Sequence, residues 1–351
     1  MKGLILAAGL GTRLRPLTSL RPKSSIPVAN RPLLAYAIEA LVDAGVEEVG
    51  IIVSPETIGG LQETVDGLDV SVPVTFVTQD APLGLAHAVE TAQPFLGQDP
   101  FVMYLADNLF ERDLRSFVAQ YRPGVSAVMG LIEVDDPRSF GVAEVAGDRV
   151  TALVEKPEHP KSNLAVAGVY VFGPEIHEAI DGLQPGAKGE YQITDAVQRL
   201  VQRGDTVLGV RLEGWWRDTG RPPEILSANR LVLERLPEGL QGTVGNEVTV
   251  SGAVVIGEGA EVRNATLVGP VVVGEGAVVE GATLGPDVSL GAGSTVRGVT
   301  VQDSVIGERC VVAGLDAPLV GCLVGNDVRV EGGGDRGHGL VLGDHAQVHL
   351  K

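Results

Sequence analysis

The chain has 351 residues, with 27 lysines and arginines against 45 aspartates and glutamates, so its formal net charge is −18. At about 100–200 residues per domain, this length predicts two or three domains. Hydrophobic residues make up 44% of the chain and charged residues 21%, which excludes wholesale disorder. The acidic balance argues against partners such as nucleic acid or an anionic membrane, because both need a basic face.

The sequence also argues for a reducing, aqueous compartment. Its two cysteines, Cys310 and Cys322, cannot form a disulfide framework and lack metal-ligand spacing. Arg13 and Arg15 interrupt the apolar N-terminal run that a signal peptide would need. No apolar stretch approaches the ~20 residues required to cross a bilayer. We therefore expect a cytoplasmic protein without a membrane partner.

Short apolar runs alternate with amphipathic segments up to about residue 237. The pattern predicts strands at 4–8, 48–53, 72–77 and 101–105, and helices at 33–44 and 85–95. This alternation is typical of an α/β fold with a mostly parallel sheet covered by helices. Ligands of such sheets bind at the carboxyl ends of the strands, so the loops after Ala8 and Leu105 are the expected site.

After about residue 240 the pattern changes, and an aliphatic residue followed by glycine recurs at about six-residue steps. The steps include Ile256-Gly257, Val273-Gly274, Leu284-Gly285, Leu290-Gly291 and Ile306-Gly307. A flexible linker would not repeat aliphatic residues at one phase, whereas a hexapeptide β-helix stacks them in its interior. We expect residues 238–351 to form such a β-helix, capped by residues 340–344.

Positive charge is concentrated at the N-terminus. Six cationic residues precede Glu39, the first acidic residue: Lys2, Arg13, Arg15, Arg21, Lys23 and Arg31. Several flank the glycine-rich loop Gly9–Leu14, which directly follows the first predicted strand. Glycine lets backbone N–H groups approach a phosphate, and nearby cations offset its charge. The loop matches neither a dinucleotide fingerprint nor a P-loop, so it predicts a phosphate site of another kind.

The run Gly9-x-Gly11-Thr12-Arg13-Leu14-x-Pro16-x-Thr18, followed by Pro22-Lys23, resembles the signature of the sugar-1-phosphate nucleotidyltransferases. Further segments resemble that family in the same order: Gln79 with Gly84-Leu85-Ala86, Leu105-Ala106-Asp107-Asn108, Phe140-Gly141-Val142, Glu155-Lys156-Pro157, Ala165–Gly168, Gly189–Asp195 and Trp216–Gly220. The resemblance implies a Rossmann-like nucleotidyltransferase domain over residues 1–237, with a mixed, mostly parallel sheet. With its extension over 238–351, the chain is similar to the family's long-form thymidylyltransferases, which implies a left-handed parallel β-helix.

The resemblance also implies roles for individual residues. Arg13 and Lys23 would be catalytic, contacting the triphosphate as pyrophosphate leaves. The nucleotide would be bound by Leu6, Ala8, Gly9, Gly11, Thr12, Arg13, Gln79 and Gly84, with Gln79 at the pyrimidine edge. The sugar phosphate would be bound by Gly141, Glu155, Lys156 and Val166.

Two aspartates are candidate metal ligands. Asp107 follows an apolar strand, and Asp218 lies in a polar turn after Trp216. Mg²⁺ retains waters and takes one or two carboxylates together with substrate phosphates. We therefore expect Mg²⁺ as the cofactor, held by Asp107 and Asp218.

The expected reaction transfers a nucleotidyl group from dTTP to glucose 1-phosphate, giving dTDP-glucose and pyrophosphate. The sugar phosphate is itself the nucleophile, so no serine, cysteine or histidine nucleophile is required. UTP as the nucleotide and another hexose 1-phosphate stay open as alternatives, because Ala8 is also common in uridylyltransferase-like relatives.

Two further functions are less favoured. Acyl transfer by the β-helix usually needs a loop histidine as base, and residues 242–337 contain none, whereas His338 lies in the tail. A non-catalytic nucleotide-sugar sensor would typically lose the lysine or a metal carboxylate, and this chain keeps both kinds of residue. The flat sides of a β-helix lead us to expect a homo-oligomer.

Overall fold

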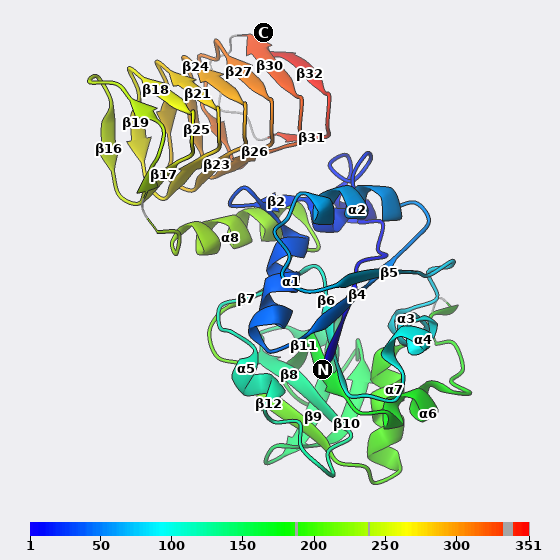
Figure 1. Cartoon of the computed structure of the whole chain (residues 1–351). Coiled ribbons are helices and arrows are strands. Elements are labelled where there is room, and N and C mark those ends of the chain that lie inside the picture. Colours follow the sequence, from blue (N-terminus) through cyan, green and yellow to red (C-terminus); the bar gives the residue numbers. More distant parts are fainter. Residues whose placement is uncertain (187–188, 238, 333–339, 351) are drawn as a thin grey trace. The chain divides into compact units, whose positions relative to one another are not determined.

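The computed structural model describes residues 1–186, 189–237, 239–332 and 340–350 (Figure 1). His338 lies outside the described residues. The chain divides into two compact units. Unit 1 comprises Met1–Gly9 and Leu34–Trp216, and unit 2 comprises Leu10–Leu33 and Arg217–Lys351. Among the described residues, the helices are all too short or too polar to span a membrane.

Unit 1 is built on a nine-stranded mixed sheet. The strand order is β5 (Val74–Thr78), β4 (Glu48–Val53), β1 (Lys2–Leu6), β6 (Phe101–Leu105), β11 (Leu164–Phe172), β8 (Ala127–Glu133), β12 (Val207–Arg211), β10 (Arg149–Glu155) and β9 (Gly141–Ala146). The strands from β5 to β6 are parallel, as the alternating pattern predicts. Beyond β6 the sheet turns mainly antiparallel, with β8 and β12 as a parallel pair.

Helices flank this sheet, and a small second sheet pairs β7 (Asn108–Phe110) with β13 (Trp216–Asp218). The helices are α1 (Leu33–Asp43), α2 (Ile58–Asp66), α3 (Leu85–Thr91), α4 (Gln93–Leu96), α5 (Arg115–Val118), α6 (Glu175–Ile180) and α7 (Ile193–Gln202), with a 3₁₀ turn at Pro137–Ser139. The helix predicted over 85–95 is divided at Ala92, because Pro94 near the start of α4 has no N–H to donate to the preceding turn.

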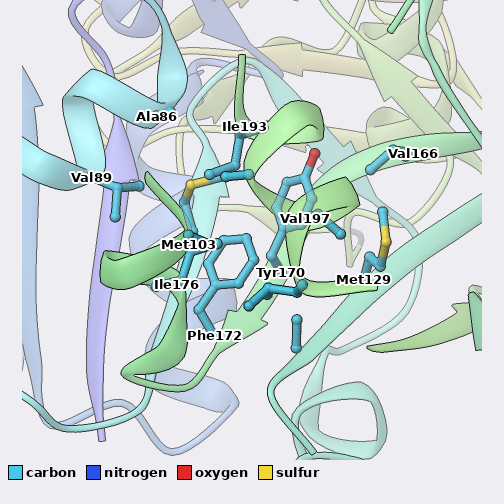
Figure 2. Close-up of a cluster of buried hydrophobic side chains, with 14 of the residues drawn as sticks. Ala86, Val89, Met103, Met129, Val166, Tyr170, Phe172, Ile176, Ile193 and Val197 are labelled. Atoms are coloured by element: carbon cyan, nitrogen blue, oxygen red, sulfur yellow. The ribbon is translucent and has the colours of Figure 1, made fainter. Parts of the chain in front are cut away.

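The main core of unit 1 lies between the sheet and helices α3, α6 and α7. Figure 2 shows Ala86, Val89, Ile176, Ile193 and Val197 from these helices facing Met103, Met129, Val166, Tyr170 and Phe172 from the strands. Full burial of a large apolar side chain contributes about 1.5–3 kcal/mol. This packing fixes the N-terminus of α7. Thr194, which follows Ile193 in the first turn of α7, is only 3% exposed.

Unit 2 contains a left-handed parallel β-helix of three sheets (Figure 1). One sheet holds β14 (Gly239–Leu240), β17 (Val254–Ile256), β20 (Val271–Val273), β23 (Val288–Leu290), β26 (Ser304–Ile306), β29 (Leu323–Val324) and β31 (Val341–Leu342). The second holds β15 (Thr243–Val244), β18 (Glu261–Arg263), β21 (Val278–Glu280), β24 (Thr295–Arg297), β27 (Val311–Ala313), β30 (Arg329–Gly332) and β32 (Gln347–Leu350). The third holds β16 (Thr249–Ser251), β19 (Thr266–Val268), β22 (Thr283–Leu284), β25 (Thr300–Gln302) and β28 (Leu319–Val320).

Stacked aliphatic side chains fill the β-helix. In the second sheet Val262, Val279, Val296, Val312 and Val330 pair in register and are fully buried. Most coils contain 17 or 18 residues, as the pairs Val254 with Val271 and Leu323 with Val341 show, so the six-residue step is not strict. The segment predicted as a cap supplies β31, which extends the first sheet.

The rest of unit 2 consists of helix α8 (Pro222–Leu233) and the segment Leu10–Leu33. That segment contains only two 3₁₀ turns, Thr12–Leu14 and Lys23–Ser25, and the two-residue strands β2 (Pro27–Val28) and β3 (Arg31–Pro32). It therefore has little regular hydrogen-bonded structure of its own.

Candidate functional site

The glycine-rich loop leaves the carboxyl end of β1. Leu14 and Leu17 are buried, whereas Arg13 and Thr12 are exposed on the intervening 3₁₀ turn. Gly9 is also exposed, and a Cβ added to it would meet no atom within 4 Å. The apolar residues anchor the loop, so its polar side chains and its first glycine face open space.

Gly11 and Lys23 lie against each other. Gly11 has a φ of +60°, and a Cβ at this position would lie 2.9 Å from Lys23 Cβ. Thr18 Oγ1 donates to the Gly11 carbonyl at 2.8 Å, which closes the loop. The left-handed backbone and the missing side chain at Gly11 are therefore what allow the Lys23 side chain to start beside the loop.

The six N-terminal cations have different surroundings. Lys2 lies at the opposite end of β1 from the loop, where its Nζ donates to the Phe95 carbonyl and lies 3.8 Å from Glu48. Arg21 is paired with Asp344 at 2.9 Å. Both are therefore engaged in structural contacts. Of the two predicted phosphate ligands, Arg13 is exposed and the Lys23 side chain starts beside Gly11.

Gln79 is held in one orientation by two acceptors. It is 6% exposed, and its amide nitrogen donates to the Gly84 carbonyl at 3.1 Å and lies 2.9 Å from His87 Nδ1. A carbonyl can only accept, so the nitrogen faces Gly84, and His87 Nδ1 must accept the second proton. Among the described residues, no group is seen to donate to the Gln79 amide oxygen.

Gly84 allows two segments to meet closely. Its φ is +101°, and a Cβ there would lie 2.5 Å from the Tyr191 carbonyl oxygen. Tyr191 also exchanges backbone hydrogen bonds with this segment, donating to Leu83 O and accepting from Ala86 N. The predicted base-recognition segment is therefore fixed to the segment that leads into α7.

Asp107 lies two residues after the end of β6, and its neighbour Asn108 orients it. Trp216 Nε1 can only donate, and it bonds Asn108 Oδ1 at 2.6 Å. The Asn108 amide nitrogen consequently faces Asp107 and donates to its Oδ1 at 2.8 Å. Tyr104 donates to the Asn108 carbonyl, and burial together with the Asp107 charge raises the pKa of Tyr104, which keeps it a donor.

Asp218 lies in unit 2, whereas Asp107 lies in unit 1. Asp218 Oδ1 lies 3.2 Å from the point where a Cβ of Gly220 would stand, and the intervening Thr219 is fully buried. The described residues contain no group of three or more His, Cys, Asp or Glu suited to a metal ion. Both aspartates offer the carboxylate oxygens that Mg²⁺ prefers.

The structure brings together all four predicted sugar-phosphate residues, and three of them surround Gly141 or lie at it. Gly141 pairs with Glu155 across β9 and β10, and a Cβ on Gly141 would lie 3.4 Å from Glu155 Oε2 and 3.5 Å from a Val166 methyl carbon. Thr194, at the start of α7, donates to the same Glu155 oxygen at 3.2 Å. Glu155, Val166 and Thr194 thus lie close together around the glycine.

Lys156 is the fourth predicted residue. Its φ is +43°, and its Nζ lies 2.7 Å from Glu155 Oε1. Burial raises the pKa of the nearby Asp195 carboxyl, and repulsion from the Glu155 carboxylate adds to the rise. The backbone of Lys156 is in the left-handed region, which is strained for a residue with a Cβ, and the Lys156 ammonium group lies beside the carboxylate of the preceding Glu155.

Several residues in these contacts are absent from the predicted site set. They are His87, Asn108, Tyr191, Thr194 and Trp216. Most of them lie inside motifs recognised in the sequence, but their roles depend on partners from distant segments. The signal that could have identified two of them is a hydrogen-bonding side chain close in sequence to a predicted ligand: Asn108 follows Asp107, and His87 lies three residues after Gly84.

The chain is similar to known nucleotidyltransferases over its first two thirds. The family model described as Nucleotidyl transferase matches residues 2–235. Two curated relatives named glucose-1-phosphate thymidylyltransferase match the whole chain. The one from Streptomyces antibioticus is 41% identical over 100% of both chains, and the one from Streptomyces griseus is 40% identical over 100% of this chain and 99% of its own.

A solved structure is also similar. It is a proposed glucose-1-phosphate thymidylyltransferase from Bacillus anthracis in complex with sucrose, and it aligns with a TM-score of 0.63 at 33% identity. The alignment covers 68% of this chain and 98% of that one. The Bacillus protein thus matches this chain over about the length of the family match.

Proposed function

Because the chain belongs to the nucleotidyltransferase family, we propose that it transfers a nucleotidyl group from dTTP to glucose 1-phosphate and releases pyrophosphate. The loop between Gly9 and Lys23 is the observation that carries this proposal. It combines an open glycine, an exposed Arg13 and a lysine that packs against Gly11. Full-length similarity to two thymidylyltransferases supports dTTP and glucose 1-phosphate as the substrates.

In the proposed reaction, an oxygen of the sugar phosphate forms a new bond to the α-phosphorus as the bond to pyrophosphate breaks. Arg13 and Lys23 bind the triphosphate and stabilise the charge that moves onto the leaving group. Leu6, Ala8, Gly9, Gly11 and Thr12 supply the backbone around the phosphates. Since the sugar phosphate is already ionised near neutral pH, the protein's main task is alignment.

Asp107 and Asp218 are the proposed ligands of Mg²⁺. When bound, Mg²⁺ would neutralise phosphate charge and fix the orientation of the triphosphate. Asn108 and Trp216 keep the Asp107 carboxylate in one orientation.

The sugar phosphate occupies the second half of the proposed site. Lys156 contacts its phosphate, and Glu155 accepts hydrogen bonds from sugar hydroxyls. Gly141 and Val166 lie beside Glu155, and the absence of a side chain at Gly141 lets Thr194 and Glu155 approach the backbone closely. Thr194 and Lys156 each contact one Glu155 oxygen, which holds the carboxylate in place.

We further propose that residues 1–237 form the catalytic domain and 238–351 the β-helix domain of a cytoplasmic homo-oligomer. Size measurement in solution by light scattering tests the oligomer, with a monomeric mass contradicting it.

Pyrophosphate release across a grid of nucleotides and sugars tests the proposed reaction. dTTP, UTP, CTP, ATP and GTP are each combined with glucose 1-phosphate and other hexose 1-phosphates, at fixed Mg²⁺. We expect dTTP with glucose 1-phosphate to give the highest kcat/KM. A higher value with UTP would favour uridylyl transfer, and no release with any pair would exclude the proposed class.

Gly11→Ala is expected to raise the KM for dTTP about tenfold and to leave the KM for glucose 1-phosphate unchanged. The new Cβ must displace the Lys23 stem, and a left-handed backbone costs about 1–2 kcal/mol for a residue with a Cβ. Gly124→Ala is the matched control, since Gly124 has a φ of +86° and no atom within 4 Å of its added Cβ. Equal effects of both variants on the KM for dTTP would show that backbone strain alone is responsible.

His87→Leu is expected to reduce the preference for dTTP over dCTP about tenfold. In the proposed complex, the N3–H of thymine would donate to the Gln79 amide oxygen, whereas cytosine has no hydrogen at N3. Without His87 as acceptor, one N–H of the Gln79 amide loses its partner, at a cost of about 1–3 kcal/mol. The amide orientation is then less strongly fixed.

Competition assays with both nucleotides measure this preference. His87→Asn has the same shape as the leucine variant but keeps an acceptor, so it should retain most of the preference. An unchanged ratio in His87→Leu would show that His87 does not orient Gln79.

A further inference from the structure

The segment that carries the proposed triphosphate ligands is attached to the β-helix. Leu10–Leu33 shares unit 2 with α8 and the β-helix, and it contains Gly11, Arg13 and Lys23. A segment of this length with so little regular structure must be ordered by contacts with other elements. Those contacts lie at three places.

The first attachment is the hairpin of β2 and β3. Its two turn residues, Ala29 and Asn30, have φ values of +48° and +62°, which are uncommon for residues with a Cβ. Ala29 N donates to Asn229 Oδ1 at 2.8 Å, and Asn30 Nδ2 donates to the carbonyl of Leu290 in β23 at 2.7 Å. The strained turn is thus held by bonds to α8 and to the β-helix.

Asn229 connects all three elements. It is 1% exposed, and its Oδ1 accepts from Ser289 Oγ at 2.6 Å as well as from Ala29. The same helix is fixed to the β-helix by Arg230, whose guanidinium makes two bonds of 2.7 Å to the Asp303 carboxylate. The hairpin is therefore docked on a rigid surface.

The second attachment is an ion pair at the C-terminal end of the β-helix. Arg21 Nε donates to Asp344 Oδ2 at 2.9 Å, and the two side chains are only 17% and 9% exposed. Asp344 Oδ1 accepts from Asn326 N at 2.8 Å, which ties the carboxylate to the preceding coil. A Cβ on the adjacent Gly343 would lie 2.7 Å from the Pro16 carbonyl, so the two backbones are close.

The third attachment is apolar and lies between the other two. Leu17, Ile26 and Pro27 line one side of a small cavity together with Arg21, and Val305, Leu323 and Val324 line the other. Arg13 and Lys23 are thus part of a segment whose apolar and polar side chains contact successive coils of the β-helix.

We propose that the β-helix is a brace for the phosphate-binding loop, with Arg21, Asp344 and Asn229 as positioning residues. The proposal rests on the proposed function for the identity of the ligand. Triphosphate contacts must be placed to within a fraction of an ångström, and a misplacement of about 1 Å costs about 100-fold in rate. A segment that is already ordered by such contacts meets this demand better than one that orders only when the nucleotide binds.

Steady-state kinetics of four full-length variants tests the brace. Asp344→Asn keeps an oxygen that accepts from Asn326 N, and it removes both the charge and the acceptor facing Arg21. Arg21→Met removes the partner charge. We expect each to raise the KM for dTTP about 10- to 100-fold without changing the KM for glucose 1-phosphate. The double variant should be no worse than either single one, and Arg21→Lys should stay near wild type.

The control is Glu280→Gln, which removes an exposed ion pair with Arg297 on the outer face of the β-helix. It should leave both KM values unchanged. Hydrogen exchange followed by mass spectrometry gives a readout independent of activity, and residues 10–33 should exchange about tenfold faster in Asp344→Asn than in wild type. Thermal unfolding of each variant identifies any general loss of structure.

An unchanged KM for dTTP in both single variants, or an equal effect of Glu280→Gln, would overturn the brace. Unchanged exchange in residues 10–33 would overturn it as well. If wild-type protein forms no dTDP-glucose, the proposed function fails, and the exchange experiment still decides whether the β-helix orders the loop.

Discussion

Arg13→Ala should lower kcat for dTDP-glucose formation about 10³-fold. The guanidinium is proposed to stabilise charge on the phosphates as pyrophosphate leaves, and removal of one such group typically costs two to three or more orders of magnitude. The side chain is exposed on a turn anchored by the fully buried Leu14, so its loss should change the thermal unfolding temperature little. Initial rates at saturating substrates measure the effect.

Two variants make this result specific. Arg13→Lys keeps the charge but not the planar pair of donors, so it should restore only part of the rate. Arg15→Ala removes an exposed cation two residues further along and should keep nearly all of the activity. A kcat for Arg13→Ala within tenfold of wild type would assign the phosphate contact to another residue.

Asp107→Asn should lower kcat about 100- to 1,000-fold even at saturating Mg²⁺. Asparagine has the same shape and can still accept the bond from Asn108, so the substitution removes the charge and little else. The loss of a metal carboxylate should also raise the Mg²⁺ concentration needed for half-maximal rate. Rates measured across a Mg²⁺ titration test both effects, and chelation by EDTA should abolish wild-type turnover.

Asp99→Asn is the matched control for the metal assignment. Asp99 is exposed and precedes β6, whereas Asp107 follows that strand. The two variants therefore make the same Asp-to-Asn change at opposite ends of β6. The control should keep wild-type rates and Mg²⁺ dependence. Wild-type turnover in Asp107→Asn would remove this residue from the metal site.

Much of the architecture could be predicted from local pattern. The strands at 48–53 and 101–105 were predicted at their observed bounds, because a continuous apolar run between breakers leaves little choice of structure. The parallel half of the sheet and the β-helix followed from the same kind of periodicity. The antiparallel half, from β11 to β9, did not, since the partner of a strand depends on contacts far away in the chain.

The candidate site shows the same division. Glycines, cations and carboxylates at characteristic spacing pointed to the loop and to Gly141, Glu155 and Val166, three residues that the fold brings together. The orientations of Gln79 and Asp107 could not be predicted. They depend on which side chain is set opposite each of them, such as His87 or Asn108, and on hydrogen-bond direction.

The sequence by itself determined where the chain is acidic and where it is cationic, because net charge and local spacing can be counted along the chain. Six cations precede Glu39. Only the tertiary structure decided what each cation does: Arg21 is committed to Asp344, more than 300 residues away, whereas Arg13 is exposed. Spacing along the chain describes what one segment can do, but burial and pairing depend on which distant segment packs against it.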